Sequence, residues 1–344
     1  MTRTVATGGG GPTPLLSVEG LTVGFRTEDG FVRVLDDVSF AVGAGETVGL
    51  VGESGCGKSV SAMSVMRLIP SPPAVTEAGR VLFDGADLLK LSDDAMRDVR
   101  GDRIGMIFQE PMTSLNPTLS IGFQIEEVLR LHRGLGRAEA RRESIAMLRA
   151  VGIGAPERRL DQYPHLLSGG LRQRVMIAMA LVCGPKLLIA DEPTTALDVT
   201  IQAQILELLR RLQRQMGMAV LLITHDLGVV AEMCDRVVVM YAGKVVEHCA
   251  TATLFREPRH PYSAGLLAAT PRRARRGERL VAIPGMVPAP GKRGAGCPFV
   301  DRCPRAIERC RAEMPPLAPV DGAVASSVAH ESACWNPVPL RGAA

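Results

Sequence analysis

Residues 52–59, Gly-Glu-Ser-Gly-Cys-Gly-Lys-Ser, follow the spacing G-x-x-x-x-G-K-[ST], which could bind the phosphates of a nucleotide. The glycines let consecutive backbone N–H groups curl around a phosphate, and a helix that begins at Lys58 would add the positive end of its dipole. We expect Lys58 to reach the β- and γ-phosphates and the Ser59 hydroxyl to ligate Mg²⁺. The alternative is a chance glycine-rich turn, which the strand expected before the motif and the helix expected after it disfavour.

Two adjacent carboxylates, Asp191 and Glu192, follow the apolar segment Lys186–Ala190. Asp191 at the end of a strand can hold Mg²⁺ through its water shell, and Glu192 is placed to polarise an attacking water. His225 follows a second apolar segment and could sense or orient the γ-phosphate. Taken alone, these residues could be an acidic turn and a surface histidine. Together with the phosphate loop they predict a site for nucleotide hydrolysis.

The elements that must position these residues alternate between strands and helices. The expected strands are Leu16–Phe25 and Val32–Phe40 as a hairpin, then Gly45–Val51, Lys186–Ala190 and Ala219–Thr224. The expected helices are Lys58–Leu68, Leu171–Cys183 and Val199–Met216, with a charged, helix-prone region at 120–165 that includes Glu139–Ala150. This order predicts an α/β fold with a largely parallel sheet.

Composition limits the class of protein. The chain has 344 residues, of which 46% are hydrophobic and 22% charged, as in an ordinary globular protein. Aromatic residues make up 3%, which argues against a stacking platform for single-stranded nucleic acid. No apolar run approaches the ~20 residues of a membrane-spanning helix, and residues 1–15 are expected to be a disordered leader without a signal core. We therefore expect a cytosolic chain with reduced thiols.

Residues 266–344 differ from the rest of the chain. They are rich in Pro, Arg, Ala and Gly, and they hold twelve Lys and Arg against six Asp and Glu. Much of the positive charge lies in 272–279, which is interpreted as a solvated linker; an anionic membrane surface or nucleic acid are the other possible partners. The shift in composition predicts a boundary near residue 266.

A second candidate anion site lies at Leu167–Arg174, where Ser168, Gly169 and Gly170 open a helix. It comes more than a hundred residues after the phosphate loop, and two such helix starts in one chain suggest sites that are completed across a dimer. This combination closely resembles the ATP-binding cassette (ABC) ATPases, whose signature motif is LSGGQ-like. In that family, ATP lies between the phosphate loop of one subunit and the signature of its partner.

The resemblance extends to the other motifs of the family. Gln109 matches the Q-loop, Ala196–Asp198 the D-loop, and His225 the switch histidine, while Phe25 stands where an aromatic ring stacks on adenine, with Phe31 as a weaker candidate. Two departures are Leu171, where Gln is commonest in the signature, and Phe25 in place of the more frequent Tyr. The resemblance implies that three residues ligate Mg²⁺, namely Ser59, Gln109 and Asp191, and that Glu192, His225 and Gln109 take part in catalysis. The full set of residues that it implies in contact with ATP and Mg²⁺ is Phe25, Gly52, Ser54, Gly55, Cys56, Gly57, Lys58, Ser59, Val60, Gln109, Ser168, Gly169, Gly170, Asp191 and Asp198.

The resemblance implies a P-loop NTPase fold of the ABC type over residues 16–265. It includes an N-terminal antiparallel β subdomain and a helical subdomain at about 110–170, followed by a small cysteine-containing extension at 266–344. Finer features resemble the dipeptide and oligopeptide importer ATPases: Gln109–Pro117, Tyr163–Gly170, Arg259–Tyr262 and the tail itself.

The importer resemblance implies partners and a location. The partners would be a second ABC ATPase as a homologous heterodimer partner, two transmembrane permease subunits and an extracytoplasmic peptide-binding protein, with no nucleic acid. The chain would lie peripherally at the cytoplasmic face of the membrane. The alternatives are the same role for another cargo, such as a nickel complex, or a non-transport ABC ATPase, which usually carries a coiled-coil insertion or two cassettes. A purely regulatory nucleotide-binding module is disfavoured by Glu192.

Eight cysteines are present, and four of them lie in the tail. A disulfide framework conflicts with the cytosolic interpretation, and the tail spacing does not match the short C-x₂₋₄-C pairs of structural zinc sites. Four thiolates suit an iron–sulfur cluster or zinc, and plain reduced thiols remain the third possibility. The importer tails that this segment resembles carry a four-Cys cluster. The resemblance therefore implies a [4Fe–4S] cluster, with zinc as the alternative, at Cys297, Cys303, Cys310 and Cys334.

Overall fold

A computed structural model of the chain describes residues 13–28, 30–110, 114–195, 197–270, 282–320 and 329–340. Residues 1–12 of the expected leader and the basic stretch 272–279 lie outside the described residues. The chain divides into two compact units, which are considered one at a time. The first comprises residues 1–43, 47–89 and 223–344, and the second comprises 44–46 and 90–222.

The first unit opens with an antiparallel sheet of strand order β2-β1-β4-β5. Its strands are β1 (Leu16–Thr27), β2 (Gly30–Val42), β4 (Ala74–Phe83) and β5 (Ala86–Asp87). The hairpin expected at 16–40 is confirmed, since β1 and β2 pair antiparallel from Leu16 opposite Val42 to Thr27 opposite Gly30. A short 3₁₀ helix, η1 (Leu88–Lys90), follows β5.

The phosphate loop follows a strand of a second sheet in the first unit. Strand β3 (Thr47–Val51) is buried at every position and pairs in parallel with β9 (Arg236–Tyr241). Helix α1 (Lys58–Val65) begins directly after the loop and ends earlier than the expected Leu68, because Arg67 adopts a left-handed φ of 49°. Helix α9 (Leu227–Met233) precedes β9, and Cys234 after it would be only 2.9 Å from a Cβ at Gly49 of β3.

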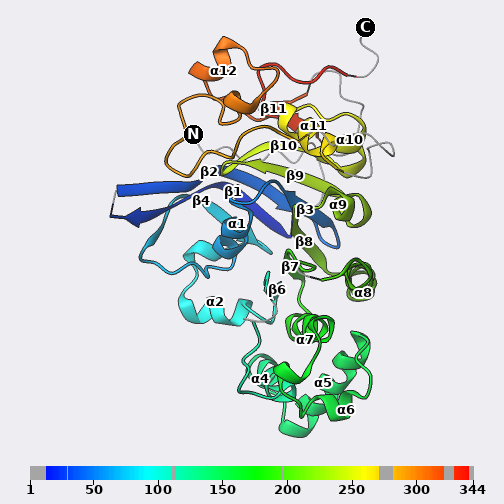
Figure 1. Cartoon of the computed structure of the whole chain (residues 1–344). Coiled ribbons are helices and arrows are strands. Elements are labelled where there is room, and N and C mark those ends of the chain that lie inside the picture. The colour runs from blue at the N-terminus through cyan, green and yellow to red at the C-terminus, as the bar shows by residue number, and fades with distance from the viewer. Residues whose placement is uncertain are drawn as a thin grey trace. The chain divides into compact units, whose positions relative to one another are not determined.

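The end of the chain adds to the same sheet (Figure 1). Strand β10 (Lys244–Ala250) pairs antiparallel with β9 and with β12 (Glu331–Ser332), which in turn pairs with β11 (Ala318–Pro319). The expected parallel pairing is therefore confirmed for β3 with β9, whereas the strands beyond β9 run antiparallel. The short helices of this region are α10 (Thr251–Arg256), α11 (Pro261–Ala268), η4 (Val300–Arg302) and α12 (Glu308–Ala312).

A cluster of aromatic rings joins the tail to this sheet. Tyr241 of β9, Tyr262 of α11 and Phe299 of the tail pack edge to face, with ring centroids 4.7 to 5.4 Å apart. All three side chains are fully buried. Such rings bury large apolar areas and add specific edge-to-face attraction. The described parts of the expected extension thus share a hydrophobic core with β9 and α11.

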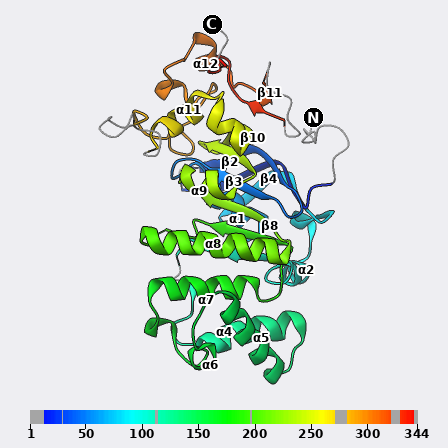
Figure 2. The same ribbon diagram turned by 90° about the vertical axis from the view of Figure 1, so that its right-hand side faces the viewer.

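The second unit contains a parallel strand pair and a group of helices (Figure 2). Strand β6 (Ile104–Ile107) pairs in parallel with β7 (Leu187–Asp191), which lies beside β8 (Ala219–Thr224). The helices are α2 (Asp93–Val99), α4 (Ile121–Arg133), α5 (Arg137–Ala150), α6 (Pro156–Arg159), η2 (Pro164–Leu166), α7 (Gly169–Leu181) and α8 (Val199–Met216).

Capping residues explain where the long helices of the second unit begin and end. The Asp198 carboxylate accepts from the N–H groups of Thr200 and Ile201 at the start of α8, and Gly217 ends the helix with a left-handed φ of 62°. The expected bounds 199–216 are confirmed. Helix α7 starts two residues before the expected Leu171, because Ser168 caps it.

Glu247 of β10 anchors the chain end and yields a test of the fold. Its side chain is fully buried and accepts from the backbone N–H groups of Arg259 (2.7 Å) and His260 (2.8 Å), and it lies 2.8 Å from Nε2 of His330. Because Glu247→Ala leaves both N–H groups buried without an acceptor, we expect a loss of about 2–6 kcal/mol in the free energy of unfolding. Glu247→Gln should lose less, because it keeps one carbonyl oxygen.

Denaturant unfolding measures this difference. The control is Glu207→Ala, which removes an exposed ion pair with Arg210 and should change the free energy of unfolding by less than about 1 kcal/mol. Equal stabilities for Glu247→Ala and the control would contradict the anchoring role.

Candidate active site

The phosphate loop lies closely against the end of β9. A Cβ at Gly52 would come within 2.3 Å of the Met240 carbonyl oxygen and 2.7 Å of Cys56 Sγ, so no larger residue fits at this position. Gly57 adopts a φ of 103° directly before α1, a conformation that glycine reaches without strain. The Gly243 N–H donates to the Cys56 carbonyl oxygen at 2.8 Å. The loop is thus built against the β9–β10 turn, as a phosphate-binding loop requires.

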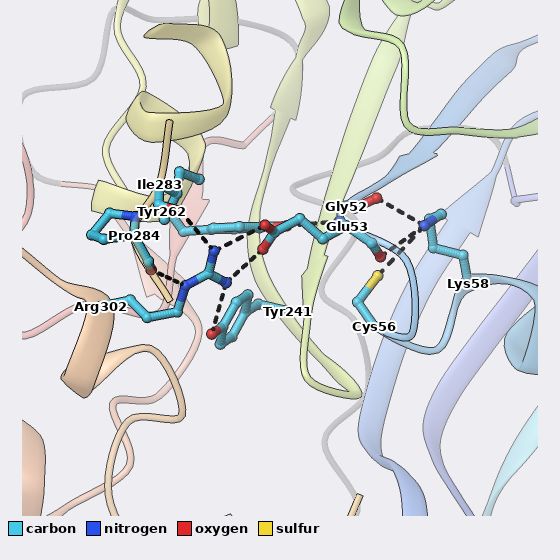
Figure 3. Close-up of polar contacts among 9 residues, drawn as sticks. All are labelled: Gly52, Glu53, Cys56, Lys58, Tyr241, Tyr262, Ile283, Pro284 and Arg302. Atoms are coloured by element: carbon cyan, nitrogen blue, oxygen red, sulfur yellow. Dashed lines mark hydrogen bonds and ion pairs between the residues drawn. The ribbon is translucent and has the colours of Figure 1, made fainter. Parts of the chain in front are cut away.

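Lys58 is buried beneath this loop. Its Nζ donates to the carbonyl oxygens of Gly52 (2.8 Å) and Glu53 (3.0 Å), and it lies 3.8 Å from Cys56 Sγ (Figure 3). The ammonium group is therefore satisfied by backbone carbonyls. Burial raises the pKa of the Cys56 thiol, which stays protonated and packs as a small apolar group.

The two candidate adenine rings differ in presentation. Phe25 of β1 is half-buried, whereas Phe31 of β2 is 42% exposed. A Cβ at Gly24 would lie 2.3 Å from Cζ of Phe31, so that ring covers the glycine. Phe31 also lines a surface hollow with Arg26 and Val75.

In the second unit, Glu192 is held by two side chains. Its Oε2 accepts from Thr195 Oγ1 at 2.8 Å and from Gln109 Nε2 at 3.3 Å. Parallel pairing of Ile107 with Ala190 brings the end of β6, and hence Gln109, beside the end of β7. Glu192 has a φ of 46°, a strained conformation for a residue with a side chain and one that is concentrated at functional sites. Asp191, one residue earlier, is 2% exposed.

The signature segment forms the start of α7 and consists of small residues. Ser168 Oγ accepts from the Leu171 N–H at 3.4 Å, and a Cβ at Gly170 would lie 3.1 Å from Cγ2 of Ile201 in α8. The contact between α7 and α8 continues where Arg174 donates to Gln204 at 3.3 Å, and Figure 2 shows the two helices side by side.

Gln173 is a residue whose role the sequence pattern did not reveal. Its side chain is 1% exposed, and its Nε2 donates to the Pro193 carbonyl oxygen. Pro193 directly follows Glu192. The signature helix is therefore bonded to the segment that carries the candidate catalytic carboxylate. A glutamine on an otherwise apolar helix face was the available signal.

The predicted site residues fall in both units. The first unit holds Phe25, the loop 52–60 and His225, which is exposed directly after β8. The second holds Gln109, the signature 168–170, Asp191, Glu192 and Asp198. Asp198 is already engaged as the cap of α8, and Ala196 of the D-loop lies outside the described residues.

The four tail cysteines converge on one hollow. Cys297, Cys303, Cys310 and Cys334 all line it, together with Phe299, Val300 and Trp335. Burial raises the pKa of Cys297 to about 11 and that of Cys334 to about 12, and the other three thiols of the group contribute to the shift at Cys334. As free thiols, Cys297 and Cys334 would stay protonated at neutral pH, and they would have to release protons to bind a metal as thiolates.

A second group of possible metal ligands lies nearby. The ligand atoms of Glu247, Cys249 and His330 are within 4.8 Å of one another. Both Glu247 oxygens already accept hydrogen bonds from backbone N–H groups. Burial, and to a smaller extent the negative charge of Glu247, raises the pKa of the Cys249 thiol well above its usual value. A carboxylate whose oxygens already accept these hydrogen bonds is a poor metal ligand, so this group is a buried hydrogen-bonded anchor.

Comparison with known proteins identifies the family. The ABC transporter family matches residues 35–195, and the oligopeptide/dipeptide transporter C-terminal region matches residues 246–310. A probable peptide ABC transporter ATP-binding protein of Sinorhizobium fredii is 54% identical over 323 residues, covering 94% of this chain and 95% of that protein. The chain belongs to the peptide-importer family of ABC transporter ATPases.

Further comparisons agree. The dipeptide transport ATP-binding protein DppD of Bacillus subtilis is 50% identical over 321 residues, covering 93% of this chain and 94% of DppD. The ATP-binding cassette MJ0796, solved as a dimer in a post-hydrolysis state with ADP and phosphate, superposes with a TM-score of 0.62 at 29% identity, covering 69% of this chain and 98% of MJ0796. The ABC nucleotide-binding fold expected for this ATPase is confirmed. Among the described residues, no helix is long and apolar enough to cross a membrane.

The bond between Gln173 and Pro193 gives a prediction for this ABC ATPase. Gln173→Leu keeps the side-chain volume but leaves the buried Pro193 carbonyl without its donor, at a cost of about 1–3 kcal/mol. We expect the segment carrying Glu192 to shift, and kcat for ATP hydrolysis to fall about tenfold with little change in the Kd for ATP.

A steady-state phosphate-release assay with a parallel nucleotide-binding titration separates the two constants. Gln213→Leu is the matched control, since Gln213 also donates to a backbone carbonyl, that of Gly45, but at an exposed position. Similar kcat values for both variants would show that the buried bond does not serve catalysis.

Proposed function

We propose that this chain binds and hydrolyses ATP to power the import of dipeptides and oligopeptides through two membrane permease subunits. An extracytoplasmic binding protein would deliver the peptide, and a homologous second ATPase would complete the pair at the cytoplasmic face of the membrane. Relatives of at least 50% identity over nearly the whole chain are described as peptide or dipeptide transport ATP-binding proteins, which supports the proposal. The observation that carries it is Glu192, held by Thr195 and Gln109 at a strained strand end.

ATP would bind first through the phosphate loop. Backbone N–H groups of Gly52, Ser54, Gly55, Cys56, Gly57, Lys58, Ser59 and Val60 supply the donors, and the start of α1 adds its dipole. Lys58 exchanges the carbonyl oxygens of Gly52 and Glu53 for phosphate oxygens, so its charge is neutralised by the ligand. For adenine, the exposure of Phe31 makes it at least as suitable as Phe25 for stacking.

The metal ligands proposed are Ser59, Asp191 and Gln109, all of which offer the oxygen donors that Mg²⁺ prefers. Their fit rests on the placement of Ser59 in the first turn of α1 and of the buried Asp191 at the end of β7. When bound, Mg²⁺ neutralises charge on the β- and γ-phosphates. We assign Ser59 of the phosphate loop and the pair Asp191 and Gln109 to the same ATP because this chain carries the motifs of the family in the family's order.

Hydrolysis then depends on Glu192. Its carboxylate orients and polarises a water molecule for in-line attack on the γ-phosphorus, a bond forms from the water oxygen, and the bond to the leaving oxygen of ADP breaks. His225 senses the γ-phosphate, and Gln109 links the carboxylate to the region that contacts the permease. ATP draws two ATPase subunits together and its hydrolysis releases them, which shifts the population between closed and open pairs.

The signature of this chain would serve the ATP of its partner subunit. Ser168, Gly169 and Gly170 present small residues and backbone N–H groups at the start of α7, and Asp198 lies at the neighbouring start of α8. The hydrogen bond from Gln173 to Pro193 would then transmit the binding of the partner's ATP at the signature to Glu192.

We further propose that Cys297, Cys303, Cys310 and Cys334 hold a [4Fe–4S] cluster. The four residues line one apolar hollow, and the importer tails that this segment resembles carry a four-Cys cluster, which together support the proposal. Such a cluster would supply a redox-active or structural centre.

The catalytic proposal predicts the behaviour of Glu192→Gln. The amide cannot act as a base, so we expect ATP hydrolysis to fall at least about a hundredfold while ATP binding is retained. Phosphate release and nucleotide binding are measured on the purified chain. The exposed Glu143 of α5 gives the control Glu143→Gln, which should keep full activity. A Glu192→Gln variant with more than about a tenth of the activity would exclude the assigned role.

The cargo is tested in cells that lack the gene for this chain. Uptake of labelled dipeptides and oligopeptides should return with the native chain and not with Glu192→Gln. Normal peptide uptake in the deleted strain, together with lost uptake of a nickel complex, would assign the ATPase to that other cargo. Copurification with DNA or ribosomes and with no membrane subunit would contradict a transport role.

The cluster proposal predicts that anaerobically purified protein is brown and contains iron and sulfide in similar amounts. Replacing any one of the four cysteines by alanine should lower the iron content by at least about half, because a three-Cys site binds the cluster weakly. Cys234→Ala is the control, a partly buried thiol of the same unit outside the hollow. Colourless protein with one zinc ion per chain would refute the assignment.

A further inference from the structure

The second residue of the phosphate loop, Glu53, turns its side chain away from the loop toward the tail (Figure 3). Both carboxylate oxygens accept from the Arg302 guanidinium: NH1 donates to Oε2 at 2.7 Å and NH2 to Oε1 at 2.9 Å. The Arg302 side chain is 6% exposed and that of Glu53 is 31% exposed. A bidentate, largely buried pair of this kind fixes orientation as well as charge.

Arg302 is itself held firmly in place. Its Nε donates to the Pro284 carbonyl oxygen at 2.7 Å, and NH1 donates to the Tyr241 hydroxyl at 3.2 Å. The guanidinium carbon also lies 5.7 Å from the centre of the Tyr241 ring. Since these contacts come from β9 and from the tail, the guanidinium is a preorganised clamp.

Helix α11 also holds the backbone of Glu53. The Tyr262 hydroxyl, from the fully buried ring at the start of α11, accepts from the Glu53 N–H at 2.8 Å. On the opposite side, the Glu53 carbonyl oxygen accepts from Lys58 Nζ. One loop residue therefore connects the phosphate-binding lysine to Arg302.

The charge of Glu53 makes this contact relevant to the ligand. A carboxylate in a loop that binds a triphosphate would repel it, and the repulsion between like charges rises as they come closer together. Arg302 neutralises the carboxylate and draws it away from the loop. Loss of the arginine would free a negative charge to approach the phosphates and would loosen the carbonyl that orients Lys58.

We propose that Arg302 is a positioning residue for the phosphate loop, through which the cysteine-bearing segment controls ATP affinity. The inference rests on the proposed ATP-binding role of the loop. Arg302 directly precedes Cys303, one of the residues lining the cysteine hollow. A change in the packing at Cys303 therefore reaches Glu53 through one peptide bond and one ion pair.

The test measures the Kd of a fluorescent ATP analogue, with Mg²⁺, for the full-length chain and its variants. We expect Arg302→Gln to raise Kd about tenfold, and Arg302→Lys to raise it less, because lysine keeps the charge but makes a single contact. The control is Arg311→Gln, since Arg311 of the same segment pairs with the exposed Asp301, and its Kd should equal that of the native chain.

A double-mutant cycle with Glu53→Gln separates positioning from general packing. Once the carboxylate is gone, Arg302→Gln should change Kd by less than about twofold, because there is no charge left to neutralise. A tenfold effect that persists in the Glu53→Gln background, or native affinity for Arg302→Gln alone, would overturn the proposal. If Arg302→Gln fails to fold, the same cycle is read with Arg302→Lys.

These outcomes are distinct from a failure of the proposed function. A native chain that does not bind ATP would refute the function itself. A native chain that binds ATP, together with an Arg302 variant of equal affinity, would refute only the positioning role.

Discussion

A phosphate loop can present its backbone N–H groups to a ligand only if its own carbonyls and its lysine are held elsewhere. In this protein the β9–β10 turn meets that constraint. Met240 leaves no room for a side chain at Gly52, and Gly243 donates to the Cys56 carbonyl. The Gly52 and Glu53 carbonyl oxygens accept hydrogen bonds from Lys58. The geometry of the loop is thus constrained by two strands, β9 and β10, that lie far from it in sequence.

The same two strands hold the end of the chain. Tyr241 of β9 contacts Arg302, and Glu247 of β10 binds the backbone at 259 and 260 and the side chain of His330. Because a buried carboxylate is stable only when fully hydrogen-bonded, Glu247 fixes where the last segments lie. The tail that carries four cysteines and the candidate phosphate loop therefore contact the same two strands.

The second unit uses the same economy of contacts. Glu192 is bonded to Gln109 at the end of β6, and Pro193 is bonded to Gln173 in the signature helix. The strained φ of Glu192 persists because neighbouring bonds determine it. The candidate catalytic carboxylate and the proline that follows it are therefore each hydrogen-bonded to a side chain from another element of the unit.

The sequence by itself determined the elements and motifs whose information is local. The phosphate motif, the acidic strand end and the signature were identified from spacing within a few residues. Helix 199–216 was bounded correctly because Asp198 and Gly217 are strong caps. Two helix bounds differ from the expected ones: α1 stops before Leu68 because Arg67 turns left-handed, and α7 starts at Gly169 because Ser168 caps it, a local signal that the expected start at Leu171 did not take into account. The four tail cysteines were grouped by family resemblance, and their convergence on one hollow comes from the structure.

Only the tertiary structure could decide the contacts between distant residues. Glu53 and Arg302 are separated by 249 positions, and neither is marked by any pattern in its own neighbourhood. Gln173 lies 20 positions before Pro193, and only the structure shows that its buried side chain donates to the Pro193 carbonyl oxygen. Propensity and spacing report what a chain does over a few residues. Which buried donor meets which acceptor is set by how the strands and the tail pack together, because a buried polar group must find its partner wherever the fold places one.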